Sequence, residues 1–490
     1  MRDRAVNGFR MLPEIVFPSM ALLFGSMFVF LVPPFQSPDE PAHFLRAYQV
    51  SEGIFFPETK DQRLGGELPV SLVQVCDSFS FLKMNYEARL DKSLIFRGLN
   101  IPLAPERRQF TDFPNTAIYA PTAYIPQAAA IALLRPLGAS PLLLLYACRL
   151  ANLFVWLLLV WAAIRLIPFL KNTLTALAML PASLVIAASA NADVLTNGLC
   201  WWLVAGFCAG NLTGIKKLTG LAVVCTNKLI ALPLVLLYWW RFHPTPGPSP
   251  TGRGDVESSV ENSREEVAAY ATSPLPVGEG WGVGLRFTIF LSAALVAALA
   301  WGTLAQKWFI PYDAYNPAYR EAQTLNEGVD PAQQQAFMLQ NPLYFAKIAA
   351  WSAIKALPST AAHVVGKFGW EKNYLSPVWL ALLWLALTAL VAAEENPFTL
   401  RQRWLAASVV ALYVVMFAAT MYALWCPVGA GEVTNFQGRY FVPVLPVVSL
   451  AIAGGWLRRW KREIWMGGLI IQTFSNLAMI WSIWERYYVL

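Results

Sequence analysis

The stretch "IVFPSMALLFGSMFVFLVPPFQSPDE", residues 15–40, decides the fold class of this chain. Its apolar part is about as long as the roughly 20 residues that a helix needs to cross the hydrocarbon core of a bilayer. It follows an arginine-containing N-terminus, is too long for a signal-peptide core and has no small-x-small cleavage site. We therefore predict that residues 1–34 form a retained signal anchor and first transmembrane helix, with Asp39 and Glu40 just beyond its end.

The composition places the whole chain in the membrane class. Of its 490 residues, 57% are hydrophobic and only 14% are charged, a balance typical of polytopic membrane proteins. Further apolar runs of spanning length lie at 141–164, 172–191, 194–213, 286–306, 375–394, 403–423, 440–457 and 464–484. The net charge of +7 comes from basic residues at the helix ends, where they set orientation, and no basic-aromatic patch indicates a nucleic acid as partner.

Two segments are ambiguous, and the distribution of positive charge decides between the alternatives. Residues 119–138 either cross the bilayer or lie flat in its interface, and residues 216–241 form either one span or two short ones. If each crossed once, basic residues of short loops would fall outside, against the positive-inside rule. We therefore predict that 119–138 lies flat and that the chain turns back near Lys228. The predicted fold is an all-α polytopic membrane protein with about 11 transmembrane helices, some of them short.

This topology divides the rest of the chain into segments. They are an outer loop with juxtamembrane helices and the acidic motif (35–140), a transmembrane bundle (141–242), a disordered cytoplasmic insertion (243–285), a transmembrane helix (286–306), a second large outer loop (307–374) and the C-terminal transmembrane helices (375–490). The insertion is predicted from its Pro-, Gly- and Ser-rich ends. We expect the polar residues of the outer segments to collect on one face of the membrane.

Asp39 and Glu40 are the first candidate catalytic residues. Asp39, His43 and Arg46 follow one another at helical spacing, which puts an acid, an imidazole and a cation on one face of a helix. A carboxylate there can take a proton from an acceptor hydroxyl, while cationic groups hold a phosphate leaving group. The alternative is that Ser37 or Asp39 only caps the helix that begins near Pro41.

Four later residues are candidates for the same outer face. Asp193 lies between two apolar runs and is either a second acid of the site or a helix cap. Lys228 lies inside an apolar stretch, where a charge is costly unless it is paired or hydrated, and is either a phosphate contact or a snorkelling side chain. Arg439 and Tyr440 either bind substrate, with Arg439 gripping a phosphate, or anchor the chain at the interface.

The cysteines give no metal-binding pattern. None of the six has the spacing of zinc ligands. Cys76 and Cys426 lie in predicted loops, so a disulfide between them is one alternative.

Six motifs together carry a resemblance to a known family. They are "SPDEPAHFLRAYQ" (37–49), "YAPTAYIPQA" (119–128), "SANADVL" (189–195), "TNKLIALPL" (226–234), "FGWEKNYLSP" (368–377) and "FQGRYFVPVLP" (436–446). With these motifs the chain resembles a bacterial family of predicted integral membrane proteins of unknown function (DUF2142-like). That family in turn looks like a relative of the GT-C glycosyltransferases, which transfer sugar from a polyprenyl-phosphate carrier on the non-cytoplasmic face of the membrane.

The resemblance implies an inner-membrane enzyme whose site faces the periplasm. It implies Asp39, with Glu40, as the base or metal ligand and Asp193 as the acid of the second outer loop, and it matches Lys228 and Arg439 by position to phosphate contacts. A divalent cation, Mg²⁺ or Mn²⁺, is used by some members of the class and not by others; Asp39 and Asp193 are its candidate ligands here. The implied partners are the bilayer, a polyprenyl-phosphate-linked sugar and an envelope glycan or lipid acceptor. Tyr-Ala-Pro at 119–121 replaces a His-Pro-Pro pattern of the mannosyltransferases.

Two other functions stay open. A transporter or flippase of a lipid-linked glycan would use the same charges to line a path through the membrane, although the chain shows no internal repeat of the kind many transporters have. An O-antigen ligase or polymerase would keep its key residues in a late outer loop, where Arg320, Lys355 and His363 are the candidates.

Overall fold

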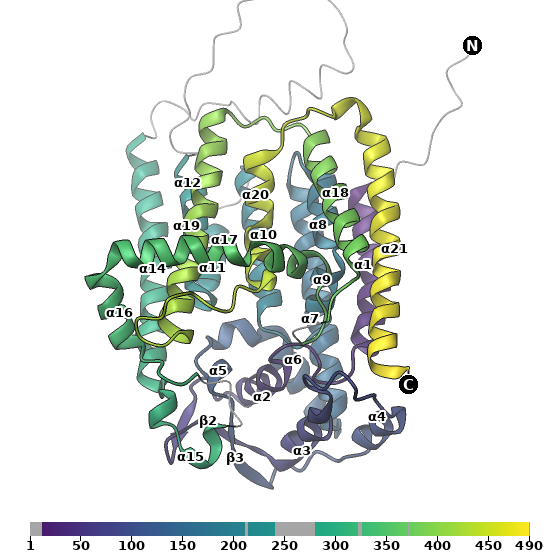
Figure 1. Cartoon of the computed structure of the whole chain (residues 1–490), viewed down its shortest axis with the longest axis vertical. Helices are drawn as coiled ribbons and strands as arrows, with labels where there is room; N and C mark the ends of the chain where they lie inside the picture. Colours follow the sequence, from purple (N-terminus) through teal and green to yellow (C-terminus); the bar gives the residue numbers. More distant parts are fainter. Residues whose placement is uncertain (1–11, 211–213, 241–279, 322–325, 371–372, 490) are drawn as a thin grey trace, which may run out of the picture.

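The computed structural model describes residues 12–210, 214–240, 280–321, 326–370 and 373–489. It is a bundle of long helices with a smaller mixed region gathered at one end (Figure 1). Among the described residues, five helices are long and apolar enough to cross a membrane: α1 (Pro13–Leu31), α7 (Pro141–Leu166), α14 (Gly280–Trp308), α19 (Leu400–Trp425) and α21 (Lys461–Tyr488). The predicted class of multi-pass, mostly helical membrane protein is therefore confirmed.

Shorter helices complete the bundle. They are α8 (Lys171–Ala178), α9 (Pro181–Ala187), α10 (Asp193–Ala209), α11 (Gly214–Asn227), α12 (Val235–Trp240), α18 (Pro377–Ala393) and α20 (Leu445–Ile452), with the 3₁₀ segments η4 (Leu229–Leu234), η6 (Gly438–Val444) and η7 (Arg458–Trp460). Two predicted spans, 172–191 and 440–457, are broken into such pieces. Prolines cause the breaks, because a proline has no N–H for the helix ladder: Pro181 separates α8 from α9, and Pro443 and Pro446 interrupt the second segment.

Small residues bring the first helices into close contact. A β-carbon on Gly25 of α1 would lie 2.5 Å from Cδ1 of Leu153 on α7, and one on Gly198 of α10 would lie 2.9 Å from Cδ1 of Leu159, also on α7. Glycine therefore allows α1 and α10 to pack closely against α7, as is common where helices pack within a membrane.

The chain reverses at Lys228, as predicted. Gly220, before the turn, and Tyr238, after it, both meet Leu203 of α10. A β-carbon on Gly220 would lie 3.1 Å from Leu203 Cδ2, and the hydroxyl of Tyr238 donates a hydrogen bond of 2.8 Å to the Leu203 carbonyl. Residues 119–138 form only short pieces, η2 (Pro121–Tyr124), α6 (Ile125–Leu134) and η3 (Arg135–Leu137). None of these is long enough to cross a bilayer.

Segment 35–140, the first predicted outer loop, contains a sheet that the all-α prediction missed. Strands β1 (Glu58–Lys60), β2 (Arg63–Pro69) and β3 (Arg108–Asp112) form one antiparallel sheet in the order β1-β2-β3. A β-carbon on Gly65 of β2 would lie 1.8 Å from the carbonyl oxygen of Thr111 on β3. The two strands can therefore pair in this register only with glycine at position 65. The sheet is joined by α2 (Glu40–Ser51), α3 (Val70–Ser78), η1 (Ser80–Leu82), α4 (Lys92–Leu99) and α5 (Pro114–Ala117).

Segment 307–374, the second predicted outer loop, contains a long helix that lies across the bundle. This helix, α17 (Pro342–Gly366), runs transverse to the long helices, after η5 (Tyr312–Ala314), α15 (Pro317–Arg320) and α16 (Pro331–Gln340) (Figure 1). The predicted insertion 243–285 falls mostly outside the described residues. Its last part is an exception and a correction: α14 already begins at Gly280, because the helix of the following apolar run extends further toward the N-terminus than the glycines suggest.

The Cys76–Cys426 disulfide is not formed. Both thiols are free and buried. These cysteines therefore belong to the packed interior.

Candidate active site

Segments that are far apart in the sequence meet at one end of the bundle, as predicted. The carboxylate of Asp39, at the start of α2, lies 2.6 Å from Nη2 of Arg439 on η6. The carboxylate of Asp193, at the start of α10, lies 2.6 Å from Nζ of Lys228 at the chain reversal. Two acids and two cations from four parts of the chain therefore form two ion pairs.

Tyr440 lies between the two cations. Its ring centroid is 4.9 Å from Cζ of Arg439 and 5.1 Å from Nζ of Lys228, within the range of cation–π attraction. Arg439 also donates a hydrogen bond of 3.0 Å to the Tyr440 hydroxyl. We call Asp39, Asp193, Lys228, Arg439 and Tyr440 the charge cluster. Its two acids and two cations balance one another.

The backbone of Asp39 turns its carboxylate toward Arg439. Asp39 has φ 62° and ψ 6°, the left-handed conformation that Asp tolerates better than most residues. It precedes the first residue of α2, but its side chain accepts no hydrogen bond from the helix. The alternative role as a side-chain helix cap therefore does not describe Asp39 in this structure.

A neighbouring asparagine leaves Asp193 free for its cation. Asn191 Oδ1 accepts a hydrogen bond of 2.8 Å from the backbone N–H of Asp193, an Asx turn that starts α10. The local capping role thus belongs to Asn191. The Asp193 carboxylate faces Lys228, and only 4% of its side chain is exposed.

His43 lies beside the charge cluster as a neutral, buried side chain. Its Nδ1 is 2.9 Å from the hydroxyl of Tyr124. Burial lowers the pKa of His43 to about 4, although the charges of Asp39 and Asp193 act to raise it. His43 is therefore uncharged at neutral pH and offers no positive charge to a phosphate.

Asp39 stays ionised in the same surroundings. Burial acts to raise its pKa, but the positive charge and the hydrogen bond of Arg439 act against burial, and the pKa is lowered overall. As long as this pair is intact, Asp39 is a weak base.

Glu40 does not belong to the candidate active site, which corrects the sequence prediction. Its side chain is fully buried, and its two oxygens lie 2.9 and 2.6 Å from Nε and Nη2 of Arg149 on α7. Oε1 also accepts the backbone N–H of Ala190 at 3.0 Å. Because all of Glu40 is enclosed and bonded, it cannot meet a substrate.

Arg46 is a second correction. Its guanidinium donates to Gln49 and to the carbonyls of Phe55 (2.7 Å) and Tyr119 (3.4 Å), and its exposure is 0%. Burial lowers its pKa to about 10, so it is still a cation, but one whose contacts hold loops together. The predicted substrate-binding role of Arg46 is not supported.

Residues missed from the sequence hold the turn that precedes Asp193. Asn152 donates to the carbonyls of Ser189 (2.7 Å) and Asn191 (2.9 Å). Gln127 donates to Asn191 (3.2 Å) and to the neighbouring Ala190 carbonyl (3.3 Å). The sequence did hold a signal for Asn152, and for Arg149 one turn before it. Both are polar residues inside the apolar run 141–164, and such a position usually marks a functional or paired group.

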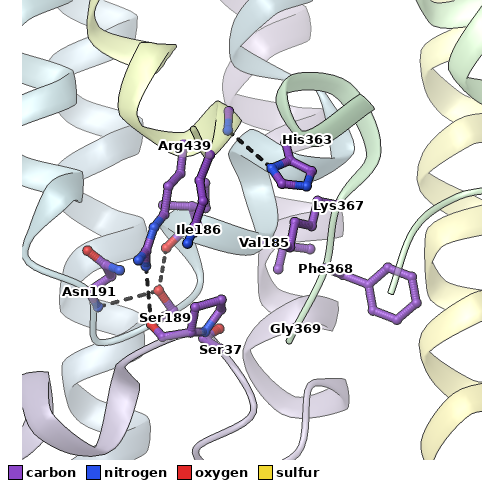
Figure 2. A pocket seen from close by; sticks show the side chains of 13 residues that line it. Ser37, Val185, Ile186, Ser189, Asn191, His363, Lys367, Phe368, Gly369 and Arg439 are labelled. Atoms are coloured by element: carbon purple, nitrogen blue, oxygen red, sulfur yellow. Dashed lines mark hydrogen bonds between the residues drawn. The ribbon is translucent and has the colours of Figure 1, made fainter. Parts of the chain in front are cut away.

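A pocket opens on the side of Arg439 that faces α17. Its water-accessible volume is about 40 Å³, room for a few water molecules or one small polar group. Figure 2 shows Arg439, His363 and Lys367 approaching it from η6, α17 and the segment after α17. Gly438 allows this approach, because a β-carbon there would lie 2.5 Å from the backbone nitrogen of Val364 on α17.

Of the residues considered for a ligase or polymerase, one reaches the pocket. His363 lines it, bonded to the Tyr374 hydroxyl and accepting the Gly438 N–H at 3.4 Å. Lys355 is exposed and paired with Glu432, and Arg320 donates to backbone carbonyls at 313 and 315. These two do not join the site.

Comparison with known families decides the relationship of the chain. The model of the family described as "predicted membrane protein (DUF2142)" matches residues 22–448. The chain belongs to this family. The matched region of the DUF2142 protein includes every residue of the charge cluster. No curated protein and no solved structure matches it.

The donor set of this DUF2142 protein does not fit a divalent cation. Mg²⁺ and Mn²⁺ need several oxygen ligands, and in the part of the chain that the structure describes no group of three or more His, Cys, Asp or Glu residues is placed to hold a metal. Asp39 and Asp193 each face a positive side chain at 2.6 Å. A dication there would have to displace both, so the mechanism below relies on the protein's own cations.

Proposed function

We propose that this protein is an integral membrane glycosyltransferase, which moves a sugar from a polyprenyl-phosphate donor to an envelope glycan or lipid on the non-cytoplasmic face. The observation that carries the proposal is the charge cluster. Two acids, each paired with a cation, surround one aromatic ring at the end of an apolar helix bundle. Such a site offers both a base for an acceptor hydroxyl and positive charge for a phosphate leaving group.

Asp39 is the proposed catalytic base. The acceptor hydroxyl oxygen attacks the anomeric carbon of the donor sugar, and the bond from that carbon to the phosphate oxygen breaks. The hydroxyl proton moves to the Asp39 carboxylate, and the electron pair of the broken bond leaves with the lipid phosphate. A single displacement of this kind inverts the configuration at the anomeric carbon.

The ion pairs explain how the base becomes active in this proposal. The phosphate of the donor is a diester with one negative charge, and it competes with Asp39 for the guanidinium of Arg439. When the donor phosphate engages Arg439 and Lys228, Asp39 loses the contact that lowers its pKa and becomes a better proton acceptor. Asp193 keeps Lys228 at the site between turnovers, and Tyr440 keeps the two cations near each other.

The finer topology is part of the same proposal. The protein lies in the inner membrane with about 11 crossings, in which α10, α18 and other short apolar helices also take part, and the charge cluster faces the periplasm. The segment boundaries predicted above apply, with α14 beginning at Gly280. Support comes from basic residues 401, 403 and 458–462, which lie at the starts of α19 and α21, away from the cluster end (Figure 1).

Mass spectrometry of lipids that co-purify with the protein tests the proposed function. We expect Asp39→Asn to retain sugar-loaded polyprenyl phosphate, whereas wild type carries the sugar-free lipid. Asp61→Asn is the matched control, because Asp61 also has a positive φ (51°) but lies exposed in the β1–β2 turn. Equal loading of wild type and Asp39→Asn would contradict the proposal. A changed passage of loaded lipid across the membrane without sugar transfer would instead identify a transporter, and indifference to Asp39 would favour a ligase.

A further inference from the structure

Two cationic side chains line the pocket beside Arg439, and one of them, Arg439, also pairs with Asp39 through Nη2. Among the described residues that line it, Arg439 and Lys367 are cationic and none is an acid. The Nε atom of Arg439 is buried and has no hydrogen-bond partner within the described part of the chain. A buried donor of this kind is costly unless a ligand or water accepts from it. The pocket therefore suits a small anionic group.

The wall of this pocket continues into the transverse helix α17. His363, near the C-terminal end of α17, and Lys367, just after it, both line the pocket. Farther toward its N-terminus, α17 exposes a row of large apolar side chains on one side: Leu343, Trp351, Ile354 and Leu357, each more than 60% exposed. Its other side is packed against the bundle through residues such as Ile348 and Ser352.

The helices that α17 packs against also expose large apolar side chains. Helices α18 and α19, against which α17 packs, show the same kind of exposure, for example at Leu385 (63%) and Trp404 (67%). Since α19 is long and apolar enough to cross the membrane, hydrocarbon is the environment of these neighbouring side chains. A helix that lies across such a bundle, with Trp and Leu on its free side, is typical of an element embedded along the membrane boundary. Figure 1 shows α17 in this transverse position.

We propose that the pocket binds the phosphate head group of a membrane lipid whose hydrocarbon chain lies along the exposed row of α17. Arg439 and Lys367 bind the phosphate, and Ile354 and its neighbours contact the chain. The site is an entry position for the donor, distinct from the transfer position at which the phosphate engages Arg439 and Lys228. It rests on the proposed function only in placing the bound lipid next to the charge cluster. Binding itself requires no transfer reaction.

Direct binding measurements on the full chain in nanodiscs of zwitterionic phospholipid test the site. The probes are polyprenyl phosphate, polyprenyl alcohol and inorganic phosphate. We expect wild type to bind polyprenyl phosphate at least about tenfold more tightly than either other probe, because only this ligand offers both a charge-assisted contact and apolar burial. Lys367→Gln should weaken the binding of polyprenyl phosphate by about tenfold or more, and Lys367→Arg should retain most of the wild-type affinity.

Matched variants separate the head-group contact from the chain contact. Ile354→Gln should weaken the binding of polyprenyl phosphate and leave the binding of inorganic phosphate unchanged. Lys355→Gln is the control for Lys367→Gln, because Lys355 is an exposed lysine of α17 that pairs with Glu432 and does not line the pocket. Asp39→Asn should bind the lipid even though it fails to transfer sugar, so loss of binding and loss of transfer are distinguished.

Three results would overturn the site. They are an unchanged affinity in Lys367→Gln, an affinity for inorganic phosphate equal to that for the lipid, and no binding of polyprenyl phosphate by wild type. The second of these would identify a free phosphate as the ligand and remove the role of α17. If the melting temperature of Lys367→Gln differs from that of wild type, the test uses the other two variants. Lys367→Arg should then keep most of the affinity for polyprenyl phosphate, and Ile354→Gln should lose it.

Discussion

Arg149 and Glu40 form a fully buried, two-contact ion pair that ties together both acids of the charge cluster. The remaining donors of Arg149 bond the carbonyls of Val29 (2.9 Å), Val32 (2.7 Å) and Pro33 (3.0 Å) at the end of α1. Glu40 follows Asp39 directly and also holds the turn that precedes Asp193 through the N–H of Ala190. One pair thus fixes the end of α1, the start of α2 and the start of α10.

Removing one partner of this pair should be strongly destabilising. Arg149→Met leaves Glu40 buried without its cation, which typically costs about 3–5 kcal/mol. We expect a lowered unfolding temperature in detergent. The control is Arg97→Met, because the Arg97–Asp91 pair is more than 60% exposed on both sides and such pairs contribute about 1 kcal/mol or less. Equal effects of the two substitutions would contradict the structural role of Arg149.

The Asp193–Lys228 pair allows stability and activity to be separated. Lys228→Gln alone should destabilise the protein, since it leaves the Asp193 carboxylate buried and unpaired. The double variant Asp193→Asn with Lys228→Gln removes both charges and should recover most of that stability. Sugar transfer should stay absent in the double variant, because the phosphate has lost a cation. Recovery of transfer together with stability would show that the pair is only structural.

The protein should become less stable as the pH falls from about 6.5 toward 4, and His43 should cause part of this loss. Its pKa of about 4 in the folded chain lies below the ordinary 6.5. Between these two values the unfolded state binds more protons than the folded state. The free energy of unfolding therefore decreases as the pH decreases. Asp39, with its lowered pKa, stays ionised over most of this range. Unfolding measured from about pH 7 to about pH 4.5 should have a smaller slope in His43→Gln than in wild type.

His363 provides the matched comparison for the pH effect. Burial also lowers its pKa to about 4, so the slope should shrink again in His363→Gln and most in the double variant. Parallel curves for wild type and both single variants would contradict the neutral, buried state of these histidines.

Gly438 should not tolerate a side chain. The β-carbon of Gly438→Ala would lie 2.5 Å from Val364 N and 2.6 Å from His363 Cβ, which forces η6 away from α17 and moves Arg439. Overpacking of this kind costs about 1–3 kcal/mol, and we expect transfer to fall along with thermal stability. Gly467→Ala on α21 has no atom within 4 Å and is the control. An active, stable Gly438→Ala variant would contradict the described contact.

The sequence predicted the arrangement of the site better than the roles within it. Apolar length and positive charge were sufficient to predict the membrane class and the reversal at Lys228, because both follow from the energetics of insertion. The predicted topology also placed Asp39, Asp193, Lys228 and Arg439 on one face, and the structure brings these four side chains together. Which of them pair depends on side-chain directions across four segments, and no local pattern in the sequence encodes these.

Adjacent acids show why roles were harder to predict. Asp39 and Glu40 are chemically alike and neighbours, yet one faces Arg439 and the other is enclosed by Arg149. The left-handed backbone of Asp39 separates them, and such a conformation is set by tertiary contacts. The sheet was missed for a related reason, since β2 contains two glycines and is stabilised by Arg63 bonding Asp112 at 2.9 Å, far along the chain.

The proposed function depends on Asp39 acting as the base at the charge cluster. Differential mass spectrometry tests it on envelope lipids and glycans of a deletion strain complemented with wild type, Asp39→Asn or Asp61→Asn at matched protein level. If Asp39 is the base, wild type and Asp61→Asn restore a defined sugar mass that the deletion and Asp39→Asn lack. Full restoration of that mass by Asp39→Asn would contradict it.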